Sequence, residues 1–278
     1  MQIKELILLA LSEDIGDGDI TSLSCIPENN TAKAHLLVKE DGIIAGIDIA
    51  KEIFNILDSS LCFQSFFIDG NKIRKGDIVF TVSGKTRSIL SAERLVLNFM
   101  QRMSGIATIT NKYVESLSGF NTKILDTRKT TPNMRFFEKY AVKIGGGENH
   151  RIGLFDMVLI KDNHVDAAGG IKQAINATIK YLKDNKLNVK IEIEARSIDE
   201  VKEILSIGGV NRIMLDNFSP KLMKEAILLI NRQYETEASG GITFDTLKKY
   251  AETGVDYISV GALTHHIKSL DLSLKISN

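Results

Sequence analysis

The stretch DMVLIKDNH, residues 156–164, joins an apolar run directly to four polar side chains. Met157 to Ile160 form the kind of short apolar run that a buried strand contains. A basic, an acidic, an amide and an imidazole side chain follow without a spacer, at Lys161 to His164. A strand that ends in this way either leads into a solvent-exposed loop or places functional side chains at its carboxyl end. The rest of the chain decides between these two interpretations.

The same pattern recurs along the second half of the chain. Short apolar runs ending in polar or glycine-rich sequence are KILDTRKT, AVKIGGG, MVLIKDNH, VKIEIEAR, RIMLDNFS, YETEASGG and YISVGALT. With AVKIGGG placed inside the first gap, the other strand ends are 34, 34, 21, 23 and 22 residues apart. Helical stretches at 170–184, 197–206 and 219–232 separate several of them. One β–α unit has about this length, so the pattern predicts an α/β fold, an incomplete parallel barrel of about seven strands.

The first hundred residues have a different, mixed pattern. It predicts helices at 2–12 and 46–57 and strands at 32–39, 62–68 and 78–83. The tail LDLSLKIS alternates apolar and polar residues, as a strand with one buried face does, and is expected to pair with this region. We therefore predict an N-terminal α+β sandwich domain at 1–110, to which 267–278 returns, and a catalytic barrel at 111–266.

The segment SAERLVLNFMQRMSGIATIT, residues 91–110, connects the two predicted domains. Because glycine weakens a helix interior, we expect two helices that are separated near Ser104 and Gly105.

Composition excludes several classes of protein. Lys plus Arg and Asp plus Glu are 35 each, so no net charge favours nucleic acid or an anionic membrane as a partner. No apolar run reaches the length of a membrane span. Cys25 and Cys62 are too few for a disulfide framework or a zinc site, and the start lacks a secretory signal. We expect a cytoplasmic protein.

Basic residues follow three of the predicted strands: Arg128, Lys129, His150, Arg151 and Lys161. Any one basic pair is most simply a solvated surface feature. In a barrel, however, the carboxyl ends of the strands meet at one face, where these cations would repel one another without a compensating anion. The pattern therefore predicts a polyanionic ligand, with arginine suited to two-point recognition of carboxylate or phosphate.

Acidic residues lie on the later strands. Glu192 and Glu194 share one strand face, and Asp216 ends the next strand. These acids either neutralise the nearby cations or, in the case of Glu194 and Asp216, hold Mg²⁺ or stabilise positive charge that develops on a substrate. Both roles are compatible.

Small residues end the last two strands, as Ser239, Gly240 and Gly241, and as Ser259, Val260 and Gly261. The loops after the final strands of a barrel often bind phosphate through backbone N–H groups. Two such turns in succession predict a phosphate site, although glycine after a strand is also a common turn residue.

Other candidates are weaker. The loop EDIGDGDITS lacks the glutamate of a calcium loop and is better explained as a turn. GGGENH lacks the strand and spacing of a dinucleotide-binding fingerprint. His265 and His266 have no obvious ligand partners, and His35 is expected to be structural.

Taken together, the motifs resemble the quinolinate phosphoribosyltransferase family over nearly the whole chain. They are ERLVLNFMQRMSGIAT, DTRKTTPNMRFFEKYAV, GGGENHRIGLFDMVLIKDNH, IEIEA, LDNFSP, EASGGIT and SVGALTH. The resemblance implies transfer of a phosphoribosyl group from phosphoribosyl pyrophosphate to quinolinate, which yields nicotinate mononucleotide, CO₂ and pyrophosphate in de novo NAD biosynthesis. It also implies Mg²⁺ as cofactor, and an α/β sandwich joined to an incomplete seven-stranded barrel.

The resemblance assigns roles to particular residues. It implies a substrate pocket of Thr127, Arg128, Lys129, His150, Arg151 and Lys161. Glu194 and Asp216 resemble the acids that bind metal and ribose, and the two small-residue turns resemble the phosphate cradle. Arg94 resembles an arginine that reaches the neighbouring subunit's active site, which implies a homodimer.

Two other functions remain as alternatives. Lys161 at a barrel strand end is also what a Schiff-base aldolase uses. The chain could instead be a non-enzymatic phosphometabolite-binding protein or a relative of the molybdenum-locus type, although KDNH and LDN count against that group.

Overall fold

The computed structural model describes residues 3–277 and divides into two compact units. The first contains the chain up to Asn111, residues 131–146 and the chain from His266; the second contains Lys112–Thr130 and Gly147–His265. The predicted domains differ from these units mainly at 131–146, which lies within the predicted barrel but clusters with the first unit. Residue 2 of the predicted first helix and residue 278 of the predicted tail lie outside the described residues.

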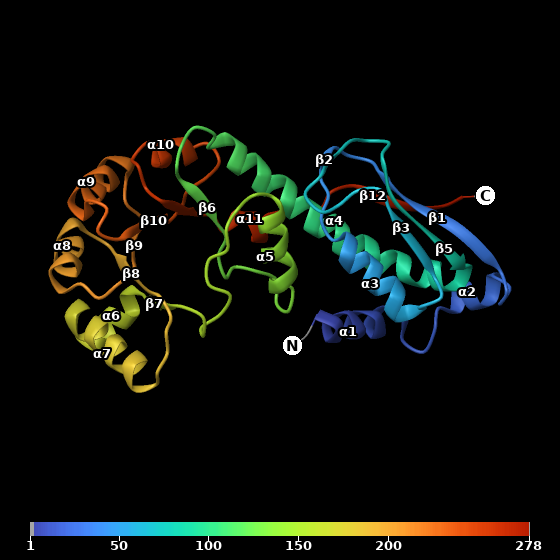
Figure 1. Cartoon of the computed structure of the whole chain (residues 1–278), viewed down its shortest axis with the longest axis horizontal. Helices are drawn as coiled ribbons and strands as arrows, with labels where there is room; N and C mark the ends of the chain where they lie inside the picture. Colours follow the sequence, from blue (N-terminus) through green and yellow to red (C-terminus); the bar gives the residue numbers. More distant parts are fainter. Residues whose placement is uncertain (1–2, 278) are drawn as a thin grey trace. The chain divides into compact units, whose positions relative to one another are not determined.

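The first unit is built on an antiparallel sheet in the order β12-β1-β5-β3 (Figure 1). Its strands are β1 (Thr31–Val38), β3 (Cys62–Ser65), β5 (Ile78–Lys85) and β12 (Leu272–Ser277). A small sheet pairs β2 (Gly42–Ile43) with β4 (Lys72–Ile73). The shorter helices of this unit are α1 (Ile3–Ile15), α2 (Ile20–Cys25), α3 (Ile47–Leu57) and α5 (Arg135–Ile144).

Alternating burial explains how this sheet packs. Ala34, Leu36 and Val38 of β1 are fully buried, whereas the residues between them are partly exposed. Phe54 of α3 packs against Phe80 of β5, with ring centres 6.1 Å apart. The alternating C-terminal tail forms β12 and pairs antiparallel with β1, as its pattern predicts.

Helix α4 (Thr86–Ser116) is continuous, so the expected break near Ser104 and Gly105 is wrong. The small residues serve close packing instead. A Cβ atom on Gly105 would lie 2.3 Å from the Lys268 carbonyl oxygen, and the Ser104 hydroxyl accepts a hydrogen bond from the Ala45 N–H at 3.0 Å. Tertiary packing therefore overrides the weak helix propensity of glycine. Across residues 3–277, none of the helices combines the length and apolar character that crossing a membrane requires.

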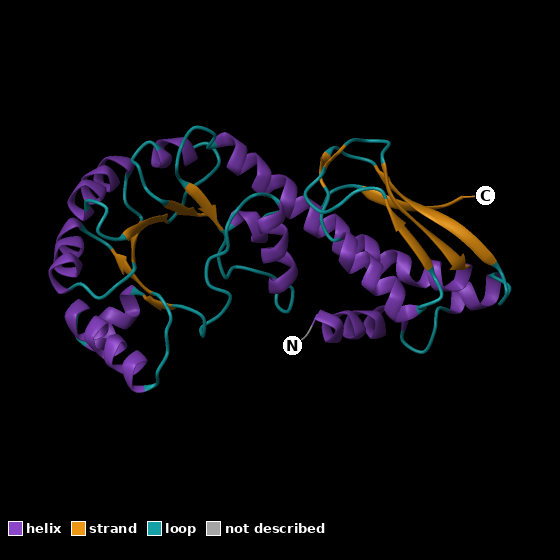
Figure 2. Cartoon of the chain, in the orientation of Figure 1, coloured by secondary structure: helices purple, strands orange, loops and turns teal. Residues whose placement is uncertain are grey.

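The second unit carries a parallel sheet that, within the described chain, has six strands in the order β6-β11-β10-β9-β8-β7. The strands are β6 (Lys123–Leu125), β7 (Val158–Ile160), β8 (Ile191–Ala195), β9 (Arg212–Asp216), β10 (Glu235–Ser239) and β11 (Tyr257–Ser259). The helices are α6 (Asp162–Ala168), α7 (Ile171–Asp184), α8 (Ile198–Ile207), α9 (Pro220–Ile230), α10 (Leu247–Ala251) and α11 (Ala262–His265). Figure 2 shows the strands as a curved row with helices along its outer side, which is an incomplete α/β barrel.

The prediction of a strand at AVKIGGG is wrong, because residues 135–144 form α5. Phe137 and Ala141, and likewise Glu138 and Val142, are buried at a spacing of four residues, which is the helical period. The strand-like contact comes just afterwards, where Glu148 forms an isolated parallel bridge with Leu125 of β6. One bridge takes the place of the seventh strand that the sequence predicts.

Candidate active site

A cavity of about 710 Å³ opens at the carboxyl ends of the parallel strands. Its volume lies in the range of small-molecule sites. Predicted site residues that line it are Thr127, Arg128, Lys129, His150, Arg151, Lys161, Glu194, Asp216, Ser239, Gly240, Gly241, Ser259 and Gly261. The fold therefore brings together side chains from widely separated parts of the chain.

A larger cavity, of about 1030 Å³, lies at the amino ends of the same strands. Residues just before the strands line it, among them Thr122, Lys190, Asn211 and Asp256. Size alone would favour this cavity. We place the active site in the smaller one because barrels carry their chemistry at the carboxyl ends and the convergent basic groups are there.

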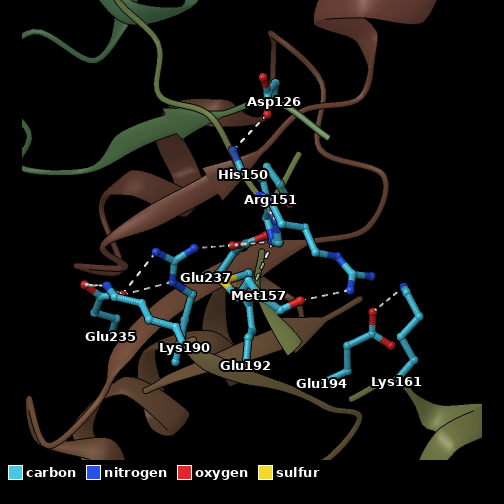
Figure 3. A network of polar contacts seen from close by, with 12 residues as sticks. Asp126, His150, Arg151, Met157, Lys161, Lys190, Glu192, Glu194, Glu235 and Glu237 are labelled. Atoms are coloured by element: carbon cyan, nitrogen blue, oxygen red, sulfur yellow. Dashed lines mark hydrogen bonds and ion pairs between the residues drawn. The ribbon is translucent and has the colours of Figure 1, made fainter. Parts of the chain in front are cut away.

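Basic side chains face one another in the carboxyl-end cavity. Burial, together with the positive charge of Arg128, lowers the pKa of the Arg151 guanidinium. The Arg151 guanidinium also donates a hydrogen bond to the Met157 carbonyl oxygen at 3.3 Å, which holds it in place (Figure 3). Two neighbouring cations that repel each other form a site that an anion would stabilise.

The position of Lys161 decides between the two interpretations of the sequence DMVLIKDNH. Strand β7 ends at Ile160, and the Lys161 ammonium lies 2.7 Å from Glu194 Oε1 in the cavity. The polar residues after it begin helix α6, and the Lys161 N–H donates to His164 Nδ1 at 2.9 Å. The strand therefore presents a lysine, and the residues that follow fix the start of the next helix.

The acids Glu194 and Asp216 lie at the carboxyl ends of neighbouring strands, β8 and β9. Burial, and then the negative charge of Glu194, raises the pKa of the Asp216 carboxyl. Two carboxylates that repel each other would be stabilised by a cation between them. The pair therefore suits a hard divalent cation, in addition to the ammonium of Lys161.

The two small-residue turns are shaped by steric limits. Gly240 has φ +98°, and a Cβ atom there would lie 2.2 Å from Asn217 Oδ1 and 2.9 Å from the Asn217 backbone nitrogen. A Cβ atom on Gly261 would lie 2.8 Å from His265 Nε2. Gly240 requires glycine because the Asn217 backbone approaches it and its φ is positive, whereas at Gly261 the His265 side chain would have to shift.

Comparison with known proteins decides the family. The model of the quinolinate phosphoribosyl transferase N-terminal domain matches residues 19–104, and that of the C-terminal domain matches residues 106–275. The chain belongs to the quinolinate phosphoribosyltransferase family. Family membership makes the carboxyl-end cavity the candidate active site of a pentosyltransferase and does not favour the aldolase or binding-protein alternatives.

Similar proteins cover nearly the whole chain. Quinolinate phosphoribosyltransferase [decarboxylating] 1b of Nicotiana tabacum is 50% identical over 99% of this chain and 82% of its own length. The probable nicotinate-nucleotide pyrophosphorylase [carboxylating] of Bacillus subtilis is 42% identical over 100% of this chain and 94% of its own. The structure of the nicotinate-nucleotide pyrophosphorylase from Francisella tularensis superposes with a TM-score of 0.93 at 42% identity, over 99% and 95% of the two chains.

Two predicted site residues of this family member lie outside the cavity lining. Val260 is buried between Ser259 and Gly261. Arg94 is exposed on α4, in the first compact unit, whereas the cavity is lined by the second. Its role remains a prediction.

Sequence reasoning missed several residues of the cavity. Asn217, Glu237 and His265 line it. The period of two that placed Glu194 at the site also places Glu237 on the same strand face as Ser239, so this acid could have been found. His265 shows no ligand partners in the sequence, and its place in the cavity beside Gly261 depends on tertiary structure.

We predict that Gly240→Ala lowers the melting temperature more than Gly241→Ala does. Both glycines have positive φ, which costs alanine about 1–2 kcal/mol. Only at Gly240 does the new methyl group also collide with Asn217; at Gly241 no atom lies within 4 Å of it. Thermal melting of the two variants measures the difference. Equal losses would contradict the close approach.

Proposed function

We propose that this chain catalyses the reaction of quinolinate with phosphoribosyl pyrophosphate, giving nicotinate mononucleotide, CO₂ and pyrophosphate in de novo NAD biosynthesis. The observation that carries the proposal is the convergence of Arg128, Arg151 and Lys161 on one cavity of a family member. Quinolinate carries two carboxylates, and a cavity with several fixed cations can neutralise and orient both.

The basic residues position the acceptor. Arg128 and Arg151 bind the carboxylates of quinolinate, because a guanidinium presents parallel N–H donors to a planar anion. Held in this way, the ring nitrogen faces the sugar carbon that carries pyrophosphate. Fixing two reactants in one geometry removes much of the entropic cost of their encounter.

The remaining groups act on the phosphoribosyl donor. Backbone N–H groups of the turns at Ser239–Gly241 and Ser259–Gly261 bind the 5′-phosphate, and Lys129 faces the departing pyrophosphate. Thr127 supports Lys129 by accepting a hydrogen bond from its N–H at 3.0 Å. Departure of pyrophosphate leaves positive charge on the ribose, which the carboxylates of Glu194 and Asp216 stabilise.

Decarboxylation follows from the bond that forms. Attack by the ring nitrogen makes that nitrogen cationic, and its charge stabilises the electron pair that stays on the adjacent ring carbon when the carboxylate leaves as CO₂. A proton from water then takes the place of CO₂ on that carbon. This step requires no organic cofactor and no nucleophile from the protein. Catalysis is therefore mainly positioning and electrostatic stabilisation.

Mg²⁺ fits the same site as a cofactor. Glu194 and Asp216 would hold it, directly or through water and pyrophosphate, and bound Mg²⁺ supplies charge neutralisation to the pyrophosphate. We predict that chelation of divalent cations abolishes turnover and that Mg²⁺ restores it. We also expect Mg²⁺ alone to raise the melting temperature of the wild type but not of an Asp216→Asn variant. Equal stabilisation of both proteins would place the ion elsewhere.

The decisive test is the release of CO₂ from carboxyl-labelled quinolinate, with and without phosphoribosyl pyrophosphate. Label release that requires the donor supports the proposal. Folded protein that releases no label would refute it. Trapping by borohydride tests the aldolase alternative, which gives the arginines that line the cavity beside Lys161 no role.

We further propose a homodimer in which Arg94 enters the partner's active site, as the family resemblance implies. Its exposure on α4 leaves the guanidinium accessible to a second chain.

We also propose a cytoplasmic location. Cys25 and Cys62 are both free and exposed, which suits a reducing compartment.

A further inference from the structure

A chain of charged side chains runs from the exposed Lys190 into the buried interior of the barrel (Figure 3). It begins at Lys190, whose ammonium lies 3.2 Å from Glu235. The Arg212 guanidinium binds Glu235 at 3.1 Å and Glu237 at 3.0 Å. Its central carbon lies 4.0 Å from the centre of the Tyr257 ring. Arg212 is therefore held from three sides, and it anchors Glu237 close to His150.

The ring of His150 has protein groups next to both nitrogens. Nδ1 accepts a hydrogen bond from the Arg151 backbone N–H at 2.7 Å. A nitrogen that accepts carries no proton, so a neutral ring has its proton on Nε2. Nε2 lies 3.0 Å from Glu192 Oε2 and 3.5 Å from Glu237 Oε2. Both nitrogens therefore face protein groups rather than the open cavity.

Glu237 has the surroundings of a neutral carboxyl group. It is completely buried, and among residues 3–277 no group donates a hydrogen bond to its Oε1. The groups that face it are His150, Glu192 of β8, Arg212 of β9 and Ser259 of β11. Burial, and then the charge of Glu192, raises the pKa of Glu237 to about 8. A protonated Glu237 can carry its proton on Oε1 and accept from Arg212 with Oε2.

We propose that Glu237, anchored by Arg212, is a positioning residue that fixes the His150 ring and, through Nδ1, the backbone of Arg151 in the active site. Arg151 then aims its guanidinium at the substrate from a fixed backbone. The kinetic readout of this inference rests on the proposed function, but the orientation of His150 does not.

His150, Glu192 and Glu237 have ligand atoms within 4.8 Å of one another, as in a metal site. Here the Arg212 guanidinium already supplies the positive charge that a metal ion would otherwise provide.

Two variants at one position test the proposal. Glu237→Gln has the shape and the hydrogen-bonding groups of the protonated acid, whereas Glu237→Leu fills the space without them. We expect Glu237→Gln to keep the KM for quinolinate within about threefold of wild type, and Glu237→Leu to raise it about tenfold or more, with a smaller change in kcat. A wild-type KM in folded Glu237→Leu would overturn the proposal. So would an equal rise in both variants.

Nitrogen NMR of histidine-labelled protein tests the orientation without any substrate. We expect the His150 signal, assigned with a His150→Gln variant, to show a neutral ring protonated at Nε2 in wild type and in Glu237→Gln. In Glu237→Leu this signature should change. A ring protonated at Nδ1 in wild type, or a signal that neither variant alters, would overturn the proposal even if the catalytic assay succeeds. If Glu237→Leu does not fold, the wild-type and Glu237→Gln spectra still decide.

The pH dependence of stability gives an independent readout. Between the ordinary pKa of a glutamate and about 8, folded Glu237 holds a proton that the unfolded chain has released. This group therefore stabilises the fold most at low pH, and its contribution is lost as the pH rises toward 8. Glu237→Gln cannot titrate, so we expect its melting temperature to increase relative to wild type as the pH rises from about 5 to about 8. A constant difference would mean that Glu237 is ionised throughout.

Discussion

Lys161→Ala should lower turnover by about 10²–10³-fold and leave the fold intact. The Lys161 ammonium lies in the cavity beside Glu194, where positive charge must meet the anions of the two substrates. Without it, Glu194 and Asp216 repel those anions and each other. Almost half of the Lys161 side chain is exposed, so its ion pair contributes little to stability. Steady-state kinetics and thermal melting of the purified variant measure the two effects separately.

Lys172→Ala is the matched control, because Lys172 is an exposed lysine on the neighbouring helix α7. Its turnover should equal that of the wild type. Lys161→Arg should restore little activity, because a planar guanidinium does not occupy the space of a compact ammonium. If Lys161→Ala lost its cooperative melting transition, the residue would be structural. Unchanged turnover would remove Lys161 from the mechanism.

Mixing inactive Arg94→Ala and Lys161→Ala chains should restore activity, and this is the second large effect that we expect. If Arg94 serves the partner's site, each mixed dimer has one site with both residues intact and one site with neither. Random assortment of the two chains then gives about one quarter of wild-type activity, because half of the dimers are mixed and half of their sites work. Co-expression with two different affinity tags isolates the mixed dimers for assay.

Two controls make this result specific. Pairing Lys161→Ala with Arg128→Ala should restore nothing, because Arg128 and Lys161 line the same cavity within one chain. Each single variant assayed alone should be inactive. If the mixed Arg94→Ala and Lys161→Ala dimers are also inactive, Arg94 does not complete the site of a partner. Activity of Arg94→Ala alone would remove it from the site altogether.

Sequence patterns predicted the elements whose burial follows a simple period. The strands that end at Ile160, Ala195, Asp216, Ser239 and Ser259 could be found because polar or small residues follow them at the spacing of β–α units, and most of them are short apolar runs. Errors arose where a local pattern fits two structures. AVKI is short enough to suit a strand, and only the preceding turn of α5 shows its helical spacing. Gly105 indicated a break because a sequence does not show that another segment packs against the glycine.

The candidate site shows the same division between local pattern and tertiary contact. Lys161, Glu194 and Asp216 could be predicted because they lie at or directly after the carboxyl ends of strands, which a barrel gathers at one face. Glu237 and Arg212 could not be assigned a role in this way. The charge of a buried carboxyl group depends on its neighbours in space. The neighbours of Glu237 come from other strands and from the loop that carries His150.

The sequence by itself determined the repeating β–α order, the return of the alternating tail to the first sheet, and which chemical groups stand at the strand ends. These features depend on the periodicity of apolar residues, which is local. The tertiary structure alone decided that α4 continues through Gly105, that His150 turns both ring nitrogens toward the protein, and that Glu237 is fully buried beside Arg212. Such properties depend on distances between residues far apart in the chain, because electrostatic and packing energies are set by neighbours in space.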